Sequence, residues 1–220
     1  MCVQWNLQPN IIEDRSFSII TDEAGPHDWN PEEWAVIQRM VHTSADFDYV
    51  INTVISPGAI KAGVEAIGDG SSIVTDTKMA LCGISTARLS SYGNRLICLI
   101  DDERTQRRAR ESGGTRAMAA VDLVYDLFFR EAQDGGIWVV GNAPTALFRL
   151  LEKLAQEPER PRPRLIVGLP VGFVNASESK EALGASPYPH ISNRGRKGGS
   201  NVAASVINAL ARLANARDKN

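Results

Sequence analysis

The chain has 220 residues, of which 43% are apolar and 23% charged, a composition that is ordinary for a globular protein. A chain of this length can bury a large core, so we expect one domain spanning residues 1–220. The formal net charge of −2 argues against nucleic acid or an anionic membrane as a partner, and no apolar run approaches the roughly 18 residues of a membrane span. The three cysteines show no metal-type spacing, which favours a reduced, cytoplasmic setting.

Strand patterns and helix patterns alternate along the chain. Helices are expected at residues 11–24, 31–49, 56–67, 78–84, 103–111, 115–131, 142–156, 175–183 and 200–220. Strands are expected at residues 71–76, 95–100, 137–141 and 165–170, and surface loops at 157–164 and 184–199. This order predicts an α/β fold: a single-domain, doubly wound, mainly parallel sheet with helices on both faces.

The helix expected at residues 31–49 ends near a histidine. Pro31 suits a first helical position, and the acidic residues after it complement the positive end of the helix. Arg39 and His42 are three residues apart and therefore neighbours on the helix surface. The last turn of a helix favours a cationic imidazole, so His42 is a candidate acid for an anionic substrate. The alternative is a capping histidine beside a solvated arginine.

Two glycine-containing turns are candidate anion sites, because ligands of such sheets bind beyond the carboxyl ends of the strands. In residues 141–145, GNAPT, free N–H groups at a helix start could hold a carboxylate, although a tight turn with an asparagine cap explains the same pattern. The basic loop at residues 195–200, GRKGGS, is either an anion site or a flexible capped loop. Neither turn matches a dinucleotide fingerprint or a phosphate-binding loop.

Other polar residues flank the predicted loops. Asp76 and Lys78 follow the first predicted strand, where a site should lie. Residues 177–180 contain the S-x-x-K spacing of some acyl-transfer enzymes, but that spacing is common by chance and no S-D-N element accompanies it. A metal site is not expected, because the histidines lack paired ligand spacing. Arginines near predicted loops are Arg88, Arg95, Arg116, Arg194 and Arg196.

Six motifs stand in an order that resembles the precorrin-8X methylmutase family, which includes the cobalt-precorrin-8 methylmutases. The motifs are RSFSII (15–20), RMVH (39–42), GNAPTALF (141–148), LPVGFV (169–174), ESK (178–180) and GRKGGS (195–200). The resemblance implies an isomerase of cobalamin biosynthesis that moves a methyl group from C-11 to C-12 of a corrin precursor, giving hydrogenobyrinic acid or cobyrinic acid. It also implies an α/β homodimer without a redox cofactor, with a substrate site close to the subunit interface.

The resemblance also suggests roles for individual residues. It makes His42 the catalytic acid that assists a [1,5]-sigmatropic shift, with Ser16, Arg39 and Arg116 contacting the substrate. Residues 85–86, Ser-Thr, depart from the Thr-Arg pair common in the family. A non-catalytic carrier of corrinoids or other tetrapyrroles is the alternative function. The remaining candidates for binding the substrate are Arg15, Asp76, Lys78, Arg88, Asn142, Thr145, Lys180 and Arg196.

Overall fold

A six-stranded sheet forms the centre of the computed structural model, which describes residues 8–129 and 134–218. The strands lie in the order β1-β6-β5-β4-β2-β3, and every neighbouring pair is parallel except β1 and β6. The predicted α/β fold with a mainly parallel sheet is therefore confirmed. The strand bounds are Thr53–Ile55 (β1), Ile73–Thr75 (β2), Leu96–Ile97 (β3), Ile137–Val140 (β4), Leu165–Gly168 (β5) and His190–Asn193 (β6).

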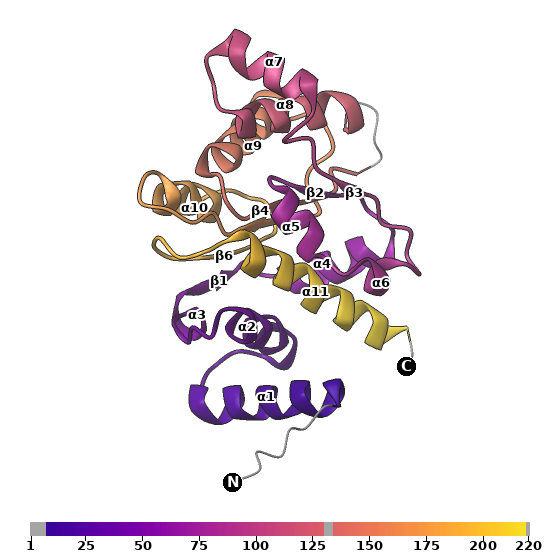
Figure 1. Cartoon of the computed structure of the whole chain (residues 1–220), viewed down its shortest axis with the longest axis vertical. Helices are drawn as coiled ribbons and strands as arrows, with labels where there is room; N and C mark the ends of the chain where they lie inside the picture. The colour runs from indigo at the N-terminus through magenta and orange to yellow at the C-terminus, as the bar shows by residue number, and fades with distance from the viewer. Residues whose placement is uncertain (1–7, 130–133, 219–220) are drawn as a thin grey trace.

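Helices cover both faces of this sheet (Figure 1). Helices α2, α4 and α11 pack on one face in one apolar cluster, and α8, α9 and α10 pack on the other face in a second cluster. Helix α1 lies outside α2. The helix bounds are Pro9–Ala24 (α1), Pro31–Ser44 (α2), Asp48–Asn52 (α3), Ala59–Gly68 (α4), Lys78–Gly83 (α5), Thr86–Leu89 (α6), Glu103–Ser112 (α7), Arg116–Phe128 (α8), Pro144–Gln156 (α9), Ala176–Gly184 (α10) and Ser200–Arg217 (α11).

The central strand β4 shows why both faces need cover. Successive side chains of a strand point to opposite faces. Ile137 and Val139 accordingly belong to the cluster beneath α4 and α11, whereas Trp138 and Val140 belong to the cluster beneath α8 and α9. All four residues are buried, which is typical of a strand covered on both faces and explains its continuous apolar sequence.

The prediction of a loop over residues 184–199 is wrong in the middle of that range, where β6 forms. The four residues of β6, His-Ile-Ser-Asn, carry little apolar pattern, yet all are buried because β1 and β5 pair with the strand on its two sides. Strand β1 also went unpredicted. Both strands depend on partners that lie far away in sequence.

The helix predicted at residues 31–49 is divided in two. Helix α2 ends at Ser44, because Ala45 adopts a left-handed conformation and donates its N–H to the Val41 carbonyl at 2.7 Å; α3 follows. Helix α6 was not predicted. Residues 130–131 and 219–220, expected to end two helices, lie outside the described residues. Throughout residues 8–129 and 134–218, every helix lacks the length or the apolar character needed to cross a membrane.

Candidate functional site

His42 lies in the last turn of α2, and its side chain is exposed. The helix is fixed at its start by a capping box. The Asn30 side chain accepts from the N–H groups of Glu32 and Glu33, both at 3.0 Å, and the Glu33 carboxylate accepts from the Asn30 N–H at 3.2 Å. The buried face of α2 packs against α11. His42 is thus held in the last turn of a helix that is fixed both at its start and along its buried face.

The arginine beside the candidate acid is already paired. Arg39 Nη2 lies 2.7 Å from Glu13 Oε1, and Arg212 Nη1 lies 3.2 Å from Glu13 Oε2. Partial burial raises the pKa of Glu13, but the hydrogen bond from Arg39 and the charges of Arg39, Arg212 and Arg88 outweigh it, so the pKa falls below its ordinary value. Glu13 therefore stays ionised and pairs with arginines of two other helices, Arg39 of α2 and Arg212 of α11.

Two further predicted residues lie on α1 beside this cluster. Ser16 Oγ donates to the Ile12 carbonyl at 2.8 Å, within the helix, and Arg15 is exposed. Sequence reasoning missed Glu13 and Arg212. An acid one turn before Ser16 was the available signal for Glu13, whereas no signal marked Arg212, which lies near the end of the chain.

The predicted anion turn binds a carboxylate, and that carboxylate belongs to the chain itself. Asp76 accepts hydrogen bonds from the N–H groups of Gly141 at 3.0 Å and of Asn142 and Ala143 at 2.8 Å each. Asp76 is 7% exposed, and burial raises its pKa while the three N–H groups counteract part of that rise. Asp76 thus fills the cradle and ties the end of β2 to the start of α9, while the Asn142 side chain remains exposed.

Lys78 and Arg116 converge on one exposed aspartate at the same edge of the sheet. Lys78 begins α5 and lies 2.8 Å from Asp101, and Arg116 begins α8 and lies 3.7 Å from it. The hydrogen bond from Lys78 lowers the pKa of Asp101, and the charges of Lys78 and Arg116 lower it further. Because both cationic side chains are about 60% exposed, they remain open to an anionic ligand.

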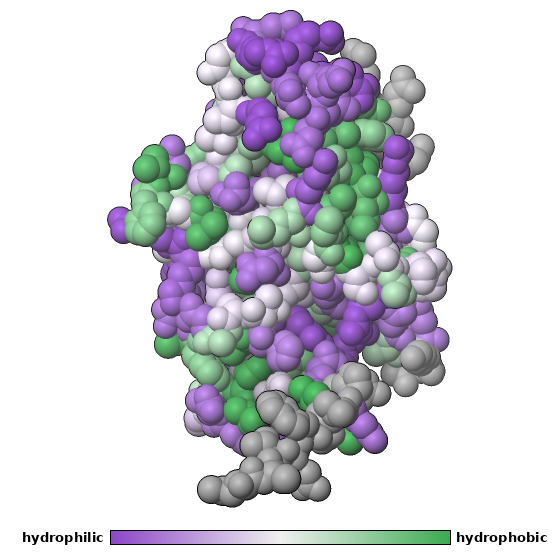
Figure 2. Space-filling model, in the orientation of Figure 1, coloured by the Kyte–Doolittle hydropathy of each residue, from purple (hydrophilic) through white to green (hydrophobic). Residues whose placement is uncertain are grey.

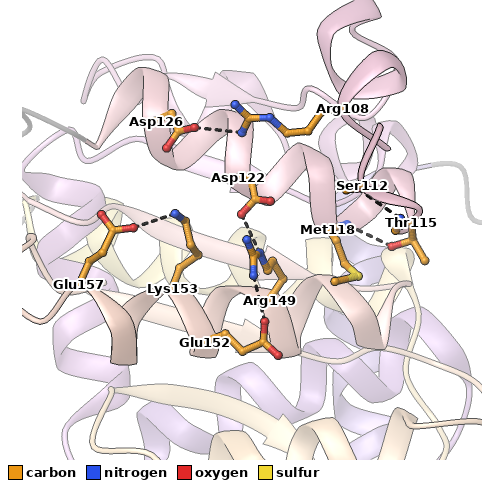
Figure 3. Close-up of polar contacts among 11 residues, drawn as sticks. Arg108, Ser112, Thr115, Met118, Asp122, Asp126, Arg149, Glu152, Lys153 and Glu157 are labelled. Atoms are coloured by element: carbon orange, nitrogen blue, oxygen red, sulfur yellow. Dashed lines mark hydrogen bonds and ion pairs between the residues drawn. The ribbon is translucent and has the colours of Figure 1, made fainter. Parts of the chain in front are cut away.

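Helices α8 and α9 hold Arg116 and Thr145 at this edge. Thr115 caps α8 by accepting the Met118 N–H at 3.2 Å, and its hydroxyl lies 3.0 Å from the Thr145 hydroxyl. Further along, Arg149 of α9 pairs with Asp122 of α8 at 2.7 Å (Figure 3). The start of α8 is therefore held beside the start of α9.

Lys180 is engaged within the protein. Its side chain is buried, and its Nζ donates to Asn193 Oδ1 at 3.1 Å and to the Lys197 carbonyl at 2.7 Å. Burial lowers the pKa of Lys180 to about 8. Ser177, the other member of the S-x-x-K spacing, donates to Glu181 at 2.9 Å. Both side chains are therefore engaged with other partners, which disfavours acyl transfer.

The basic loop at residues 195–200 connects the sheet edge to the end of α2. Lys197 Nζ lies 2.6 Å from Asp46 and 2.7 Å from Asp48, on the segment that follows His42. Arg196 is exposed and lies over the ring of Phe173, 5.5 Å from its centroid. The loop therefore presents the Arg196 guanidinium beside an exposed aromatic ring.

The structure thus brings the predicted residues together in two groups. One group surrounds α1 and α2, and the other follows the carboxyl ends of the strands. Apolar side chains accompany the second group: Phe173 is 86% exposed and Val174 is 77% exposed. Figure 2 shows apolar surface on the flank where α10 and its neighbouring loops lie. The first group is Arg15, Ser16, Arg39, His42 and Arg88; the second is Asp76, Lys78, Arg116, Asn142, Thr145, Lys180 and Arg196.

No metal centre is evident in the described part of the chain, where histidine, cysteine and carboxylate side chains form no group of three or more that could hold an ion. The chemical resources of the site are an exposed imidazole, exposed cations and exposed apolar side chains. Such a set can bind a flat apolar molecule with anionic substituents and can move a proton.

Comparisons with known proteins give one family. The sequence pattern of precorrin-8X methylmutase matches residues 11–213. The chain is 43% identical to a cobalt-precorrin-8 methylmutase of Leptospira interrogans, with 94% of each chain covered. It is 41% identical to a precorrin-8X methylmutase of Sinorhizobium sp, with 92% of this chain and 94% of the other covered. The crystal structure of a precorrin-8X methylmutase from Thermus thermophilus superposes with a TM-score of 0.84 at 42% identity, covering 94% of this chain and 98% of that one.

Proposed function

The chain belongs to the precorrin-8X methylmutase family, and we propose that it moves a methyl group from C-11 to C-12 of precorrin-8X or of its cobalt-containing counterpart. It is therefore an isomerase of cobalamin biosynthesis. The observation that carries this conclusion is the match of residues 11–213 together with relatives above 40% identity over nearly the whole chain. The relatives are named as enzymes, which leaves the carrier alternative without support.

His42 is proposed as the general acid of this reaction. A [1,5]-sigmatropic methyl shift breaks one carbon–carbon bond as it forms another, so it requires no nucleophile and no hydride carrier. Protonation of a ring nitrogen withdraws electron density from the macrocycle and eases the shift, and the proton returns afterwards. An exposed imidazole at the end of α2 is placed where a bound substrate can reach it. We propose that no redox cofactor takes part.

Exposed cations are proposed to bind the carboxylates at the rim of the substrate. Lys78, Arg116 and Arg196 are exposed at the sheet edge, and Arg15 is exposed on α1. Phe173 and Val174 offer apolar contacts for the flat ring. Arg39 and Lys180 already have partners within the chain, so their contribution to binding is proposed to be smaller than that of the exposed cations.

We propose a homodimer whose substrate site lies near the subunit interface. Helix α1 carries exposed apolar residues, including Ile12 at 48% and Ile19 at 45% exposure, which a second copy of the chain could cover. The proposal also includes one domain over residues 1–220 and a cytoplasmic location, since Cys82 and Cys98 are free thiols.

Incubation with precorrin-8X and with its cobalt derivative, followed by absorbance, tests the reaction. We expect His42→Ala to retain binding of the corrinoid product and to lose conversion, because only the acid is removed. His27→Ala, which removes a histidine stacked on Trp34 near the other end of α2, is the matched control and should convert normally. Conversion by His42→Ala at the wild-type rate would disprove the role of His42.

A further inference from the structure

Two guanidinium groups lie over the ring of Phe17. Phe17 follows Glu13 by four residues, so both face the same side of α1. Arg39 Cζ lies 4.6 Å from the ring centroid and Arg212 Cζ lies 5.7 Å from it, both within the range of a cation–π interaction. Because Glu13 binds these same two arginines, it holds them in place at the ring.

The same ring touches the proposed acid. The Phe17 and His42 ring centroids are 5.2 Å apart at an interplanar angle of 70°, which is the edge-to-face arrangement that aromatic pairs prefer. Helix α2 also fixes the backbone of Phe17, since Gln38 Nε2 donates to the Phe17 carbonyl at 3.0 Å and to Thr21 Oγ1 at 2.8 Å. The ring is therefore held by its backbone and by its guanidinium neighbours.

The His42 imidazole has few other restraints. Its side chain is exposed, and within residues 8–129 and 134–218 it makes no hydrogen bond. An exposed ring without a hydrogen bond rotates freely about its side-chain torsions unless packing restrains it. Among the described residues, Phe17 supplies the ring contact that restrains His42.

We propose that Phe17 is a positioning residue that fixes the orientation of the His42 imidazole, and that Glu13 stabilises this arrangement through Arg39 and Arg212. The inference rests on the proposed role of His42 as the acid. A proton donor must be held in the correct geometry when the substrate binds, and a displacement of about 1 Å at a catalytic group can cost about 100-fold in rate. Helix α1 would then serve the reaction through its inner face as well as through Ser16.

Phe17→Leu tests the proposal, because leucine retains an apolar side chain and removes the ring. We expect kcat to fall about 10-fold or more while the Kd for the corrinoid product stays within about twofold. Phe17→Tyr keeps the aromatic ring, so its kcat should be close to that of wild type. Glu13→Gln weakens the hold on both arginines and should lower kcat by a smaller factor.

The matched control is Phe128→Leu. Phe128 is a half-buried ring on α8 with Arg95 4.5 Å from its centroid, so it reproduces the arginine contact without a histidine. Its kcat should equal that of wild type. In parallel, the His42 ring resonances, assigned by their loss in His42→Ala, should shift in Phe17→Leu and not in Phe128→Leu.

Two results would overturn the proposal. One is an unchanged kcat with unshifted His42 resonances in Phe17→Leu. The other is equal loss of kcat and of product binding without recovery in Phe17→Tyr, which would indicate a structural role. If Phe17→Leu fails to fold, the proposal is tested instead by kcat, product binding and the His42 resonances of Phe17→Tyr and Glu13→Gln. Full conversion by His42→Ala would instead refute the proposed acid and leave the Phe17–His42 ring contact unaffected.

Discussion

Replacing Asp76 by alanine separates a structural role from a role in substrate binding. The Asp76 carboxylate accepts three backbone hydrogen bonds at the turn between β4 and α9, at 2.8–3.0 Å. If the carboxylate is part of the fold, its loss must destabilise the protein. If it is a substrate ligand, its loss must weaken binding and leave stability nearly unchanged.

The expected loss follows from the geometry. A hydrogen bond to a charged group contributes about 1.5–3 kcal/mol, and a buried donor left unpaired costs about 1–3 kcal/mol. Gly141 is buried, while Asn142 is exposed and Ala143 half-buried, so water can replace the carboxylate at part of the turn. We therefore expect Asp76→Ala to lower the free energy of unfolding by about 3–5 kcal/mol, measured by urea denaturation with circular dichroism.

Asp101→Asn is the control, since it removes a carboxylate from the same edge that is exposed and bound only by side chains. Its urea midpoint should match that of wild type. A structural role of Asp76 is refuted if Asp76→Ala unfolds within about 1 kcal/mol of wild type and yet loses affinity for the corrinoid product. That outcome would make Asp76 a substrate ligand.

Three further predictions concern the same edge of the sheet. Lys180→Met should remove a pH dependence of stability: folding lowers the lysine pKa from 10.5 to about 8, so between these values the unfolded chain binds more protons and wild-type stability rises with pH. Urea midpoints from pH 7 to 10 should rise more steeply for wild type than for the variant. Gly141→Ala should destabilise the fold, because its Cβ would lie 2.7 Å from Ser200 Cα; thermal unfolding measures the loss, and an unchanged midpoint contradicts it. Arg116→Ala should raise KM, by a factor that shrinks as salt is added; a salt-independent factor would exclude a screened charge contact.

The sequence predicted those features that depend on neighbouring residues. Pro31 and the acids after it marked the start of α2, because helix starts have local signals. The end of the same helix was missed, since Ala45 takes a left-handed conformation that favours glycine or asparagine. Strand β6 was missed because its burial depends on pairing with β1 and β5.

In the candidate site, too, the sequence predicted local features and missed contacts between distant residues. The sequence indicated that N–H groups at residues 141–143 could hold a carboxylate, because a strand leads directly into a helix there, but it offered them to a substrate. Their actual partner, Asp76, lies 65 residues away from Gly141, and no local pattern specifies such a pairing. The contacts of Arg39 with Glu13 and Phe17 likewise join two helices whose packing the sequence pattern does not encode.

Several cations proposed to bind the substrate already contact groups of the chain itself. The solvent exposure of each contact decides whether a substrate carboxylate can replace it. Asp101 is exposed and competes with solvent for Lys78 and Arg116, so a substrate carboxylate can take its place at little cost. Lys180 is buried against a carbonyl and an amide oxygen, and an incoming carboxylate would have to displace both. Arg39 is intermediate, because its side chain is 14% exposed and its partner Glu13 is 27% exposed. A substrate that reaches Arg39 must therefore share it with Glu13, the residue that also steadies the ring beside His42.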